Sequence, residues 1–174
     1  MTERGEGLKG QLRSYEIFKT HILRDLFQEV FPIPEIHSYG SELRFVRHYF
    51  GTPPREIKTC LEEKTTFSAP LRIKLILEGL GTYETKEQDL YMAEFPLMTT
   101  KGTFIINGSE YKPAVDASLV FEKELKKGLR RMATTTRKLM AKTDPAIATP
   151  SGLISNRPFL GAIKRSLVRI SPQS

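Results

Sequence analysis

The chain has 174 residues, enough for one domain of ordinary size or for two small domains that pack together. Hydrophobic residues make up 39% and charged residues 27%, which is typical of globular proteins and excludes a largely disordered or membrane-spanning chain. One cysteine and three scattered histidines exclude an internal disulfide and show no metal-ligand spacing. Residues 1–7 are polar and lack the apolar core of a secretory signal, so we expect a protein of the cytoplasm or of an organelle interior.

The net charge of +7 is unevenly distributed along the chain. Residues 121–169 contain twelve Lys or Arg against three acidic residues, a local charge of +9, and the rest of the chain carries −2. Such a basic segment is typical of proteins that lie against a polyanion, most often nucleic acid. A solvated helix face that keeps the protein soluble explains the charge equally well, and the charge alone does not separate the two interpretations.

The first predicted element is a helix that ends near residue 30. Apolar residues recur every three or four positions from Leu12 to Val30, with charged residues between them. Prolines at positions 32 and 34 end this pattern, because proline lacks an amide donor and disfavours helical geometry in the preceding residue. Residues 43–50, rich in branched and aromatic side chains, indicate a strand.

Further strands are predicted in the middle of the chain. Residues 71–77 have apolar side chains at every odd position and mostly polar ones between, which indicates a half-buried strand. Residues 88–95 form the next strand, and residues 103–112 form a hairpin, because Asn107-Gly108 tolerates the positive φ of a type I′ turn. We expect these strands and residues 43–50 to form one antiparallel sheet. The expected core includes Leu26, Leu71, Ile73, Leu75, Met92, Phe95, Phe104 and Ile106.

The helical period returns in the basic third of the chain. Residues 117–141 predict a helix with basic residues opposite an apolar face, and a shorter helix follows over about residues 158–168. The apolar face is lined by Leu125, Leu129, Met132 and either Leu139 or Met140. The sequence therefore predicts an α+β fold with an N-terminal helix, a small antiparallel sheet with an Asn-Gly hairpin, and basic C-terminal helices. We expect two units, an α+β domain over residues 1–116 and a basic helical segment over residues 117–174.

Motifs for catalysis are absent from the sequence. It contains no phosphate-binding Gly-rich loop, no Gly-x-Ser-x-Gly elbow, no His-Glu-x-x-His helix and no acidic cluster for two magnesium ions. Glu62, Glu63, Glu84 and Glu87 are expected to be surface acids. Cys60 is expected to be a small buried hydrophobe rather than a nucleophile. The residues therefore predict a non-catalytic module without a cofactor.

Two stretches in the middle of the chain carry a resemblance to a known family. Residues 86–108 (KEQDLYMAEFPLMTTKGTFIING) have a strand that ends at Pro-Leu-Met-Thr, followed by a hairpin with Gly-x-Phe-x-Ile-Asn-Gly. Residues 66–75 (TFSAPLRIKL) precede them as a second strand. Both are similar to the β subunit of bacterial-type DNA-directed RNA polymerase. With residues 31–33 and 41–43, the resemblance extends over about residues 10–112, the region called the protrusion.

A third stretch resembles a later part of the same subunit. Residues 128–132 (GLRRM), 153–158 (LISNRP) and 162–164 (AIK) look like the start of its fork region. The resemblance implies a non-catalytic N-terminal part of the β subunit that walls the DNA channel and supports assembly. The lobe and the catalytic C-terminal part would be absent from it, and magnesium would be held by the β′ subunit. The chain would thus be part of a nucleotidyltransferase without contributing catalytic residues. The alternative is a stand-alone nucleic-acid-binding or regulator-docking module derived from that region.

The resemblance and the local charge together single out two sets of residues. The basic residues expected to face DNA or RNA phosphates are Arg130, Arg131, Arg137, Lys138, Arg157, Lys164 and Arg165. The resemblance also implies that Thr85, Lys86 and Glu87 would occupy the strand edge on which regulators of the family dock. The implied partners are the remainder of β, β′, α, DNA and RNA, and transcription regulators at the protrusion–lobe edge, with no membrane.

Overall fold

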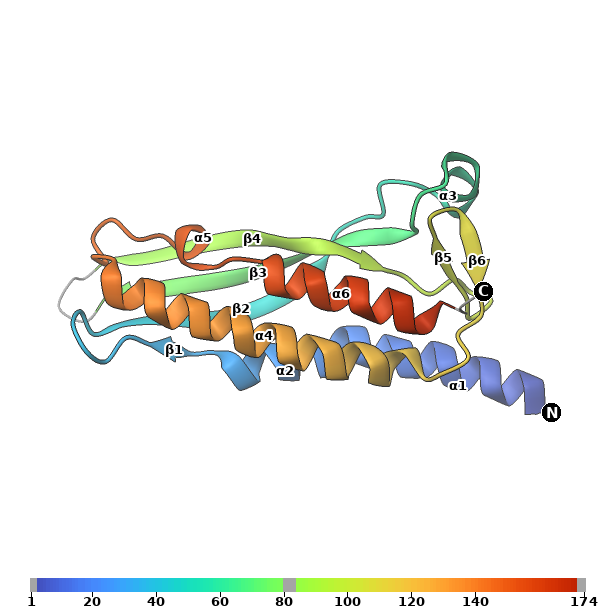
Figure 1. The fold of residues 1–174 in the computed structure, drawn as a ribbon, viewed down its shortest axis with the longest axis horizontal. Helices are drawn as coiled ribbons and strands as arrows, with labels where there is room; N and C mark the ends of the chain where they lie inside the picture. Colours follow the sequence, from blue (N-terminus) through green and yellow to red (C-terminus); the bar gives the residue numbers. More distant parts are fainter. Residues whose placement is uncertain (1–2, 80–83, 172–174) are drawn as a thin grey trace.

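A computed structural model describes residues 3–79 and 84–171 of the chain. Figure 1 shows an elongated molecule in which helices lie along a long antiparallel sheet. The described helices are α1 (Glu3–Ile17), the π-helical turn η1 (Phe18–Ile22), α2 (Leu23–Val30), α3 (Ile57–Glu63), α4 (Ala117–Lys142), α5 (Pro150–Leu153) and α6 (Arg157–Ile170). The described strands are β1 (Ile33–Pro34), β2 (Ser41–Phe50), β3 (Ser68–Gly79), β4 (Thr85–Pro96), β5 (Phe104–Ile106) and β6 (Ser109–Tyr111). The predicted α+β fold is confirmed.

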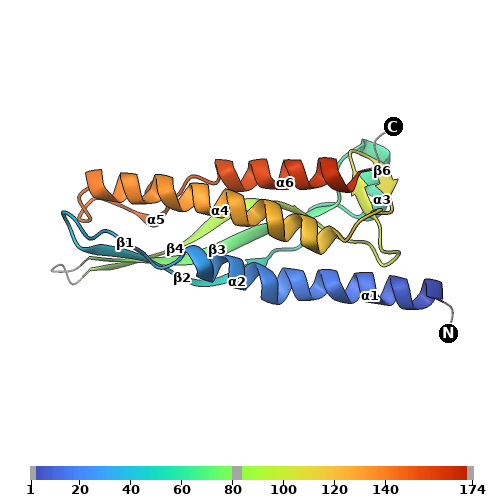
Figure 2. The same cartoon turned by 60° about the horizontal axis from the view of Figure 1, so that its bottom comes forward.

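The N-terminal helix runs through a π turn. The helices α1, η1 and α2 are continuous, because Ile17 and Leu23 at the joints keep right-handed helical backbone angles. A π turn shifts the backbone pairing by one residue, and here the Lys19 carbonyl accepts a hydrogen bond from His48 Nε2 of β2 at 2.6 Å. The helix ends at Val30 as predicted, because the backbone of Phe31 is extended. Figure 2 shows α1 and α2 running alongside α4.

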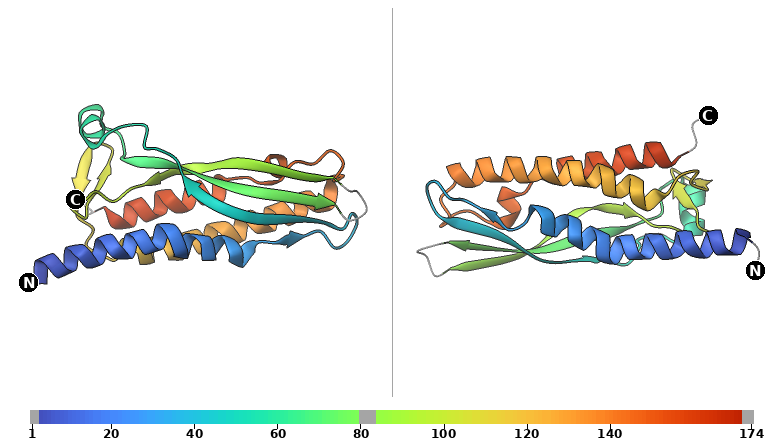
Figure 3. Two further views of the ribbon diagram at one scale, coloured as in Figure 1. Left: turned by 180° about the vertical axis from the view of Figure 1, so that it is seen from behind. Right: turned by 90° about the horizontal axis from the view of Figure 1, so that it is seen from below.

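Strands β1 to β4 form one sheet in chain order, with every neighbouring pair antiparallel. Leu71, Ile73 and Leu75 of β3 are fully buried, whereas the residues between them are only partly buried. This alternation confirms the predicted half-buried strand. In the view from behind, the strands lie in front of α4 and α6 (Figure 3). The buried side chains of β3 therefore face the layer of helices.

The hairpin of β5 and β6 has the turn that the sequence predicts. Asn107 and Gly108 both have positive φ, 51° and 82°, and Ile106 pairs with Ser109 across the turn. A side chain at position 108 has no room, because its Cβ would lie 2.5 Å from the Cα of Lys64. Both the conformation and the close approach of the backbone thus require glycine there.

The expectation that residues 103–112 extend the main sheet is wrong. They form a separate two-stranded sheet. Pro96 ends β4, and the chain then reverses in a turn closed by a hydrogen bond from the Thr99 amide to the Thr103 carbonyl at 2.8 Å. The hairpin packs instead beside α3, a helix that the sequence patterns did not predict. Its Ile105 carbonyl accepts a hydrogen bond from the Phe67 amide at 2.9 Å.

An aromatic cluster joins the N-terminal helix, the sheet and α4. The ring centroid of Phe121 lies 5.1 Å from that of Phe95, 5.8 Å from that of Phe18 and 6.0 Å from that of Tyr15. Burying an aromatic side chain contributes about 1.5–3 kcal/mol. Every residue of the expected core is buried, which confirms that prediction. The two predicted units share this hydrophobic core, and the boundary between them at residue 116 stays a prediction.

Candidate nucleic-acid interface

Helix α4 presents most of the candidate residues. Asp116 caps its N-terminus, because its carboxylate accepts hydrogen bonds from the amides of Ser118 at 3.0 Å and Leu119 at 3.4 Å. The apolar residues of the helix face the core, and of the predicted alternatives it is Met140 that is buried, whereas Leu139 is 37% exposed. The opposite face of α4 is free to carry charge.

The cations of α4 form two adjacent lines. Residues seven apart lie on nearly the same side of a helix. Arg130 and Arg137 therefore lie on one line, and Arg131 and Lys138 lie on the next. All four side chains are exposed. A span of seven residues covers about 10 Å of helix axis, so the four charges form a compact patch.

Sequence reasoning missed two residues on the first line. Lys123 and Lys127 are exposed and precede Arg130 at spacings of four and three residues. Spacings of four and three keep side chains on one helix face. The helical spacing of these two lysines is the sequence pattern that identifies them. They extend the line of Arg130 and Arg137 toward the start of α4.

Helix α6 packs closely on α4 at Gly128. A Cβ built on Gly128 would lie 2.7 Å from the Pro158 carbonyl oxygen and 3.1 Å from the Ala162 Cβ. Glycine is therefore needed for the helices to approach this closely. The contact brings Lys164 and Arg165 of α6 beside the basic helix, and both side chains are exposed.

A buried carboxylate connects the two helices. Glu124 of α4 accepts hydrogen bonds from Arg165 Nε at 2.9 Å and from Arg169 Nη1 at 3.2 Å. The hydrogen bond from Arg165 is the main cause that lowers the pKa of Glu124 below its usual value. Arg165 thus holds α6 against α4, while its side chain remains 46% exposed.

Arg157 lies apart from the α4 lines, at the start of α6. The preceding Asn156 donates a hydrogen bond from its side chain to the Met92 carbonyl at 2.8 Å, which fixes this end of α6 on β4. Arg157 lines a polar depression of about 480 Å³ together with Asp89 and Tyr91 of β4. The depression thus places a carboxylate, that of Asp89, near Arg157.

The predicted docking edge is partly occupied by the chain itself. β4 is the last strand of the sheet. The ammonium of Lys86 donates to the carbonyls of Pro145, Ala146 and Ala148 at 3.0, 3.0 and 2.6 Å. These acceptors satisfy all three donors of the ammonium, so Lys86 holds the connector between α4 and α5. Thr85 and Glu87 are exposed, and Glu87 forms an ion pair with Lys74 at 3.0 Å.

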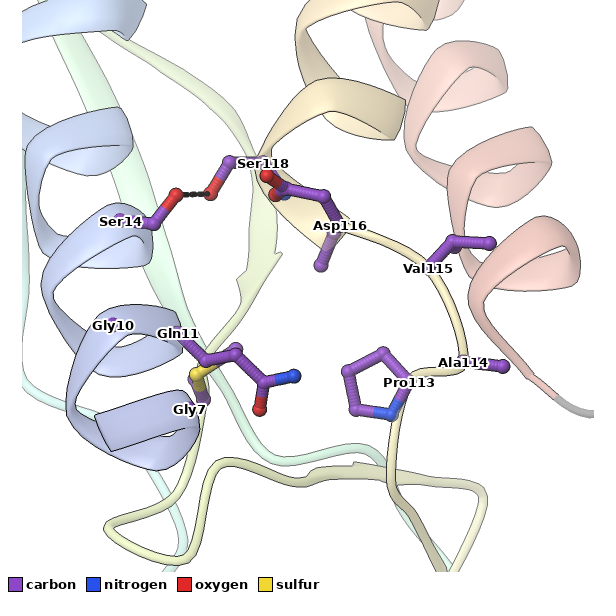
Figure 4. Close-up of a pocket in the computed structure, with 11 residues that line it drawn as sticks. Gly7, Gly10, Gln11, Ser14, Pro113, Ala114, Val115, Asp116 and Ser118 are labelled. Atoms are coloured by element: carbon purple, nitrogen blue, oxygen red, sulfur yellow. Dashed lines mark hydrogen bonds between the residues drawn. The ribbon is translucent and has the colours of Figure 1, made fainter. Parts of the chain in front are cut away.

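A cavity of about 420 Å³ lies between α1 and residues 113–118 (Figure 4). Its one carboxylate, Asp116, already caps α4. Cys60 is fully buried, as expected. Across residues 3–79 and 84–171, no three His, Cys, Asp or Glu side chains gather as metal ligands, and no helix of that part is long and apolar enough to cross a membrane.

Comparison with known proteins confirms the resemblance. No family model matches the chain. It is 41% identical over 103 residues to the DNA-directed RNA polymerase subunit beta of Chloroflexus aggregans. It is 44% identical over 100 residues to the subunit of the same name from Lysinibacillus sphaericus. These matches cover 59% and 58% of this chain, and the chain spans about 8% of the length of each relative.

Proposed function

We propose that this chain, a relative of part of the bacterial RNA polymerase β subunit, serves as a non-catalytic, protrusion-like part of that enzyme. In this role it would help to wall the DNA channel and support assembly. The β′ subunit and the rest of β would supply the catalytic residues, β′ would hold the magnesium, and α would be a further assembly partner. The matched 8% of each relative is consistent with a part of the enzyme rather than the whole.

The observation that carries the proposal is the pair of basic lines on α4. Arg130, Arg131, Arg137 and Lys138 are exposed, and within the described parts of the chain none of them forms an ion pair. Unpaired cations in a compact patch suit the phosphates of DNA or RNA. Lys164 and Arg165 on the neighbouring α6 would extend the contact. Phosphate contacts carry no base selectivity, and we expect none.

The proposal is tested by binding of labelled duplex DNA to the purified chain at low salt. We expect a Kd on the order of 10⁻⁴ to 10⁻⁶ M. Replacing Arg130, Arg131, Arg137 and Lys138 by alanine should weaken binding by more than about tenfold. It should also reduce the salt slope by about 0.9 for each phosphate that the variant no longer neutralises.

A matched control separates this patch from the general effect of charge. Alanine at the exposed Lys9, Lys58, Lys101 and Lys112 removes the same formal charge from other parts of the molecule. This control should bind duplex within about twofold of the unsubstituted chain, because counterion release depends on local contacts. Equal affinity and equal salt slope in both variants would show that the α4 lines are only a solvated helix face.

One observation favours the alternative of a stand-alone module. The N-terminal and C-terminal parts share a hydrophobic core, and residues 112–116 connect β6 directly to α4. Such a unit has its own core and needs no lobe to close it. Affinity purification of the tagged chain distinguishes the two functions. Recovery of β′, α and the remainder of β supports a polymerase subunit. Their absence supports the stand-alone module. In that case regulator docking at Thr85 and Glu87 would be a second role of the module.

A further inference from the structure

An apolar groove runs between the N-terminal helix and the start of α4. Ile17, Phe18 and Ile22 line one side, and Leu119 of α4 lines the other, around a depression of about 310 Å³. Arg13, Asp116 and Glu122 also line it. Leu119 is 62% exposed and Ile17 is 42% exposed. Adjoining apolar side chains left in water mark interaction surfaces more often than single exposed ones do.

The groove continues along α4 into a basic section. Past Leu119 lies a second depression of about 410 Å³, which shares Leu119 and Glu122 with the first. It is lined further by the cations Lys123, Lys126, Lys127 and Arg130. Figure 2 shows α1 running beside the start of α4. The groove therefore has an apolar end and a positively charged end.

The cations of the basic section are largely uncommitted. Lys126 lies 3.8 Å from Glu29 of α2, a distance at the limit of an ion pair. Within residues 3–79 and 84–171, Lys123, Lys127 and Arg130 form no ion pair with a carboxylate. Their long apolar stems line the depression while their charged ends remain in water. Such a surface is complementary to a ligand that is apolar on one face and acidic on its flank.

We infer that this groove docks an amphipathic acidic helix of a partner protein. The apolar face of that helix lies on Ile17 and Leu119, and its carboxylates lie over Lys123, Lys127 and Arg130. The apolar section lies between two helices, and the basic section lies along the exposed face of α4. In this mode of docking, residues at helical spacing anchor the ligand. The distance along α4 from Leu119 to Arg130 corresponds to about 16 Å of helix, so the partner helix spans about three turns.

A protein helix fits the groove from Ile17 and Leu119 to Arg130 better than nucleic acid does. Phosphates have no apolar face to cover Leu119 and Ile17. Between Arg131 and Lys138 the exposed residues of α4 are all polar, which suits a phosphate backbone. The two halves of α4 thus present two different surfaces, which meet at Arg130.

The test uses the whole chain and a fluorescein-labelled synthetic peptide of about four helical turns. The peptide has Leu at helical spacing on one face and Glu on the flank, and its control has Gln in place of every Glu. Leu119→Ser should weaken binding of the acidic peptide by at least about tenfold, as expected for a central apolar anchor. Lys123→Gln with Lys127→Gln should weaken it severalfold at low salt, and the Gln peptide should bind as weakly.

Matched variants keep the result separate from the nucleic-acid proposal. Arg137→Gln with Lys138→Gln should leave peptide binding unchanged, and Leu119→Ser should leave duplex binding unchanged. Amide chemical shifts perturbed by the peptide should map to residues near Ile17 and Leu119. If Leu119→Ser does not unfold the chain and still binds the peptide equally well, the inference is wrong. Ile17→Ser gives a second anchor variant should Leu119→Ser prove unstable.

Two further outcomes would also overturn the inference. Equal binding of the Gln and Glu peptides would remove the charge complementarity on which the choice of an acidic partner rests. Loss of duplex binding in Leu119→Ser, without loss of peptide binding, would assign the groove to the nucleic-acid surface instead.

Discussion

Glu35 is a buried carboxylate that holds the loop between β1 and β2. It accepts hydrogen bonds from the backbone amides of four residues, His37, Ser38, Tyr39 and Gly40. These bonds, with that from Tyr39 first, lower the pKa of Glu35 from 4.5 to about 2. Because the folded pKa lies below the unfolded one, this contribution to stability is present above pH 4.5 and is lost as the pH falls toward 2.

We therefore expect Glu35→Gln to remove part of the acid sensitivity of the fold. The melting temperature of the unsubstituted chain should drop between about pH 4.5 and pH 2, and that of Glu35→Gln should drop less while lying lower near neutral pH. Thermal melts followed by circular dichroism across this range measure both. Glu62→Gln is the control, because Glu62 is exposed and outside this loop. Parallel melting curves for Glu35→Gln and the unsubstituted chain would contradict the role given to the carboxylate.

At the scale of elements, the approach of α6 to α4 depends on Gly128. Gly128→Ala places a Cβ 2.7 Å from the Pro158 carbonyl oxygen, so the helices must separate. Overpacking of this kind costs about 1–3 kcal/mol and outweighs a gain in helix propensity of about 1 kcal/mol. Gly10→Ala is the matched control, because Gly10 also lies in a helix and its added Cβ meets nothing within 4 Å. Denaturant unfolding should show Gly128→Ala destabilised and Gly10→Ala stabilised, and a stable Gly128→Ala would refute the close packing.

Among the helices and strands, sequence patterns predict the features that are local and miss those that depend on distant contacts. Alternation predicted β3, and Asn107-Gly108 predicted the hairpin turn, because both signals are local. The π turn was not predictable from local patterns, since the Lys19 carbonyl within it accepts a hydrogen bond from His48, 29 residues away. Helix α3 has only seven residues, too few for its apolar spacing of Ile57, Cys60 and Leu61 to repeat along the chain. For the candidate interface, the helical period predicted which cations of α4 are exposed. The ion pair of Arg165 with Glu124 could not be predicted, because it depends on how α6 packs on α4.

At the scale of the whole molecule, the C-terminal helices complete the core of the N-terminal part. Phe159 of α6 is fully buried, and its ring centroid lies 5.9 Å from that of Phe27 in α2 and 6.5 Å from that of Phe95 in β4. One side chain thus contacts elements on both sides of the boundary predicted at residue 116. A core shared in this way favours unfolding in a single cooperative transition.

We therefore expect Phe159→Ala to destabilise the entire chain by about 3–5 kcal/mol, the usual cost of removing a buried phenylalanine. Val168→Ala on the same helix is the control, because Val168 is 59% exposed. Denaturant titration followed by far-ultraviolet circular dichroism and by tyrosine fluorescence should give coincident transitions in all three proteins, with only that of Phe159→Ala shifted. Tyrosine fluorescence reports only the part before residue 117, since the tyrosines lie outside residues 117–174, whereas circular dichroism reports the whole backbone. Two separate transitions, or a fluorescence transition unmoved by Phe159→Ala, would mean that residues 117–174 unfold as an independent unit and that the shared core does not couple them to the sheet.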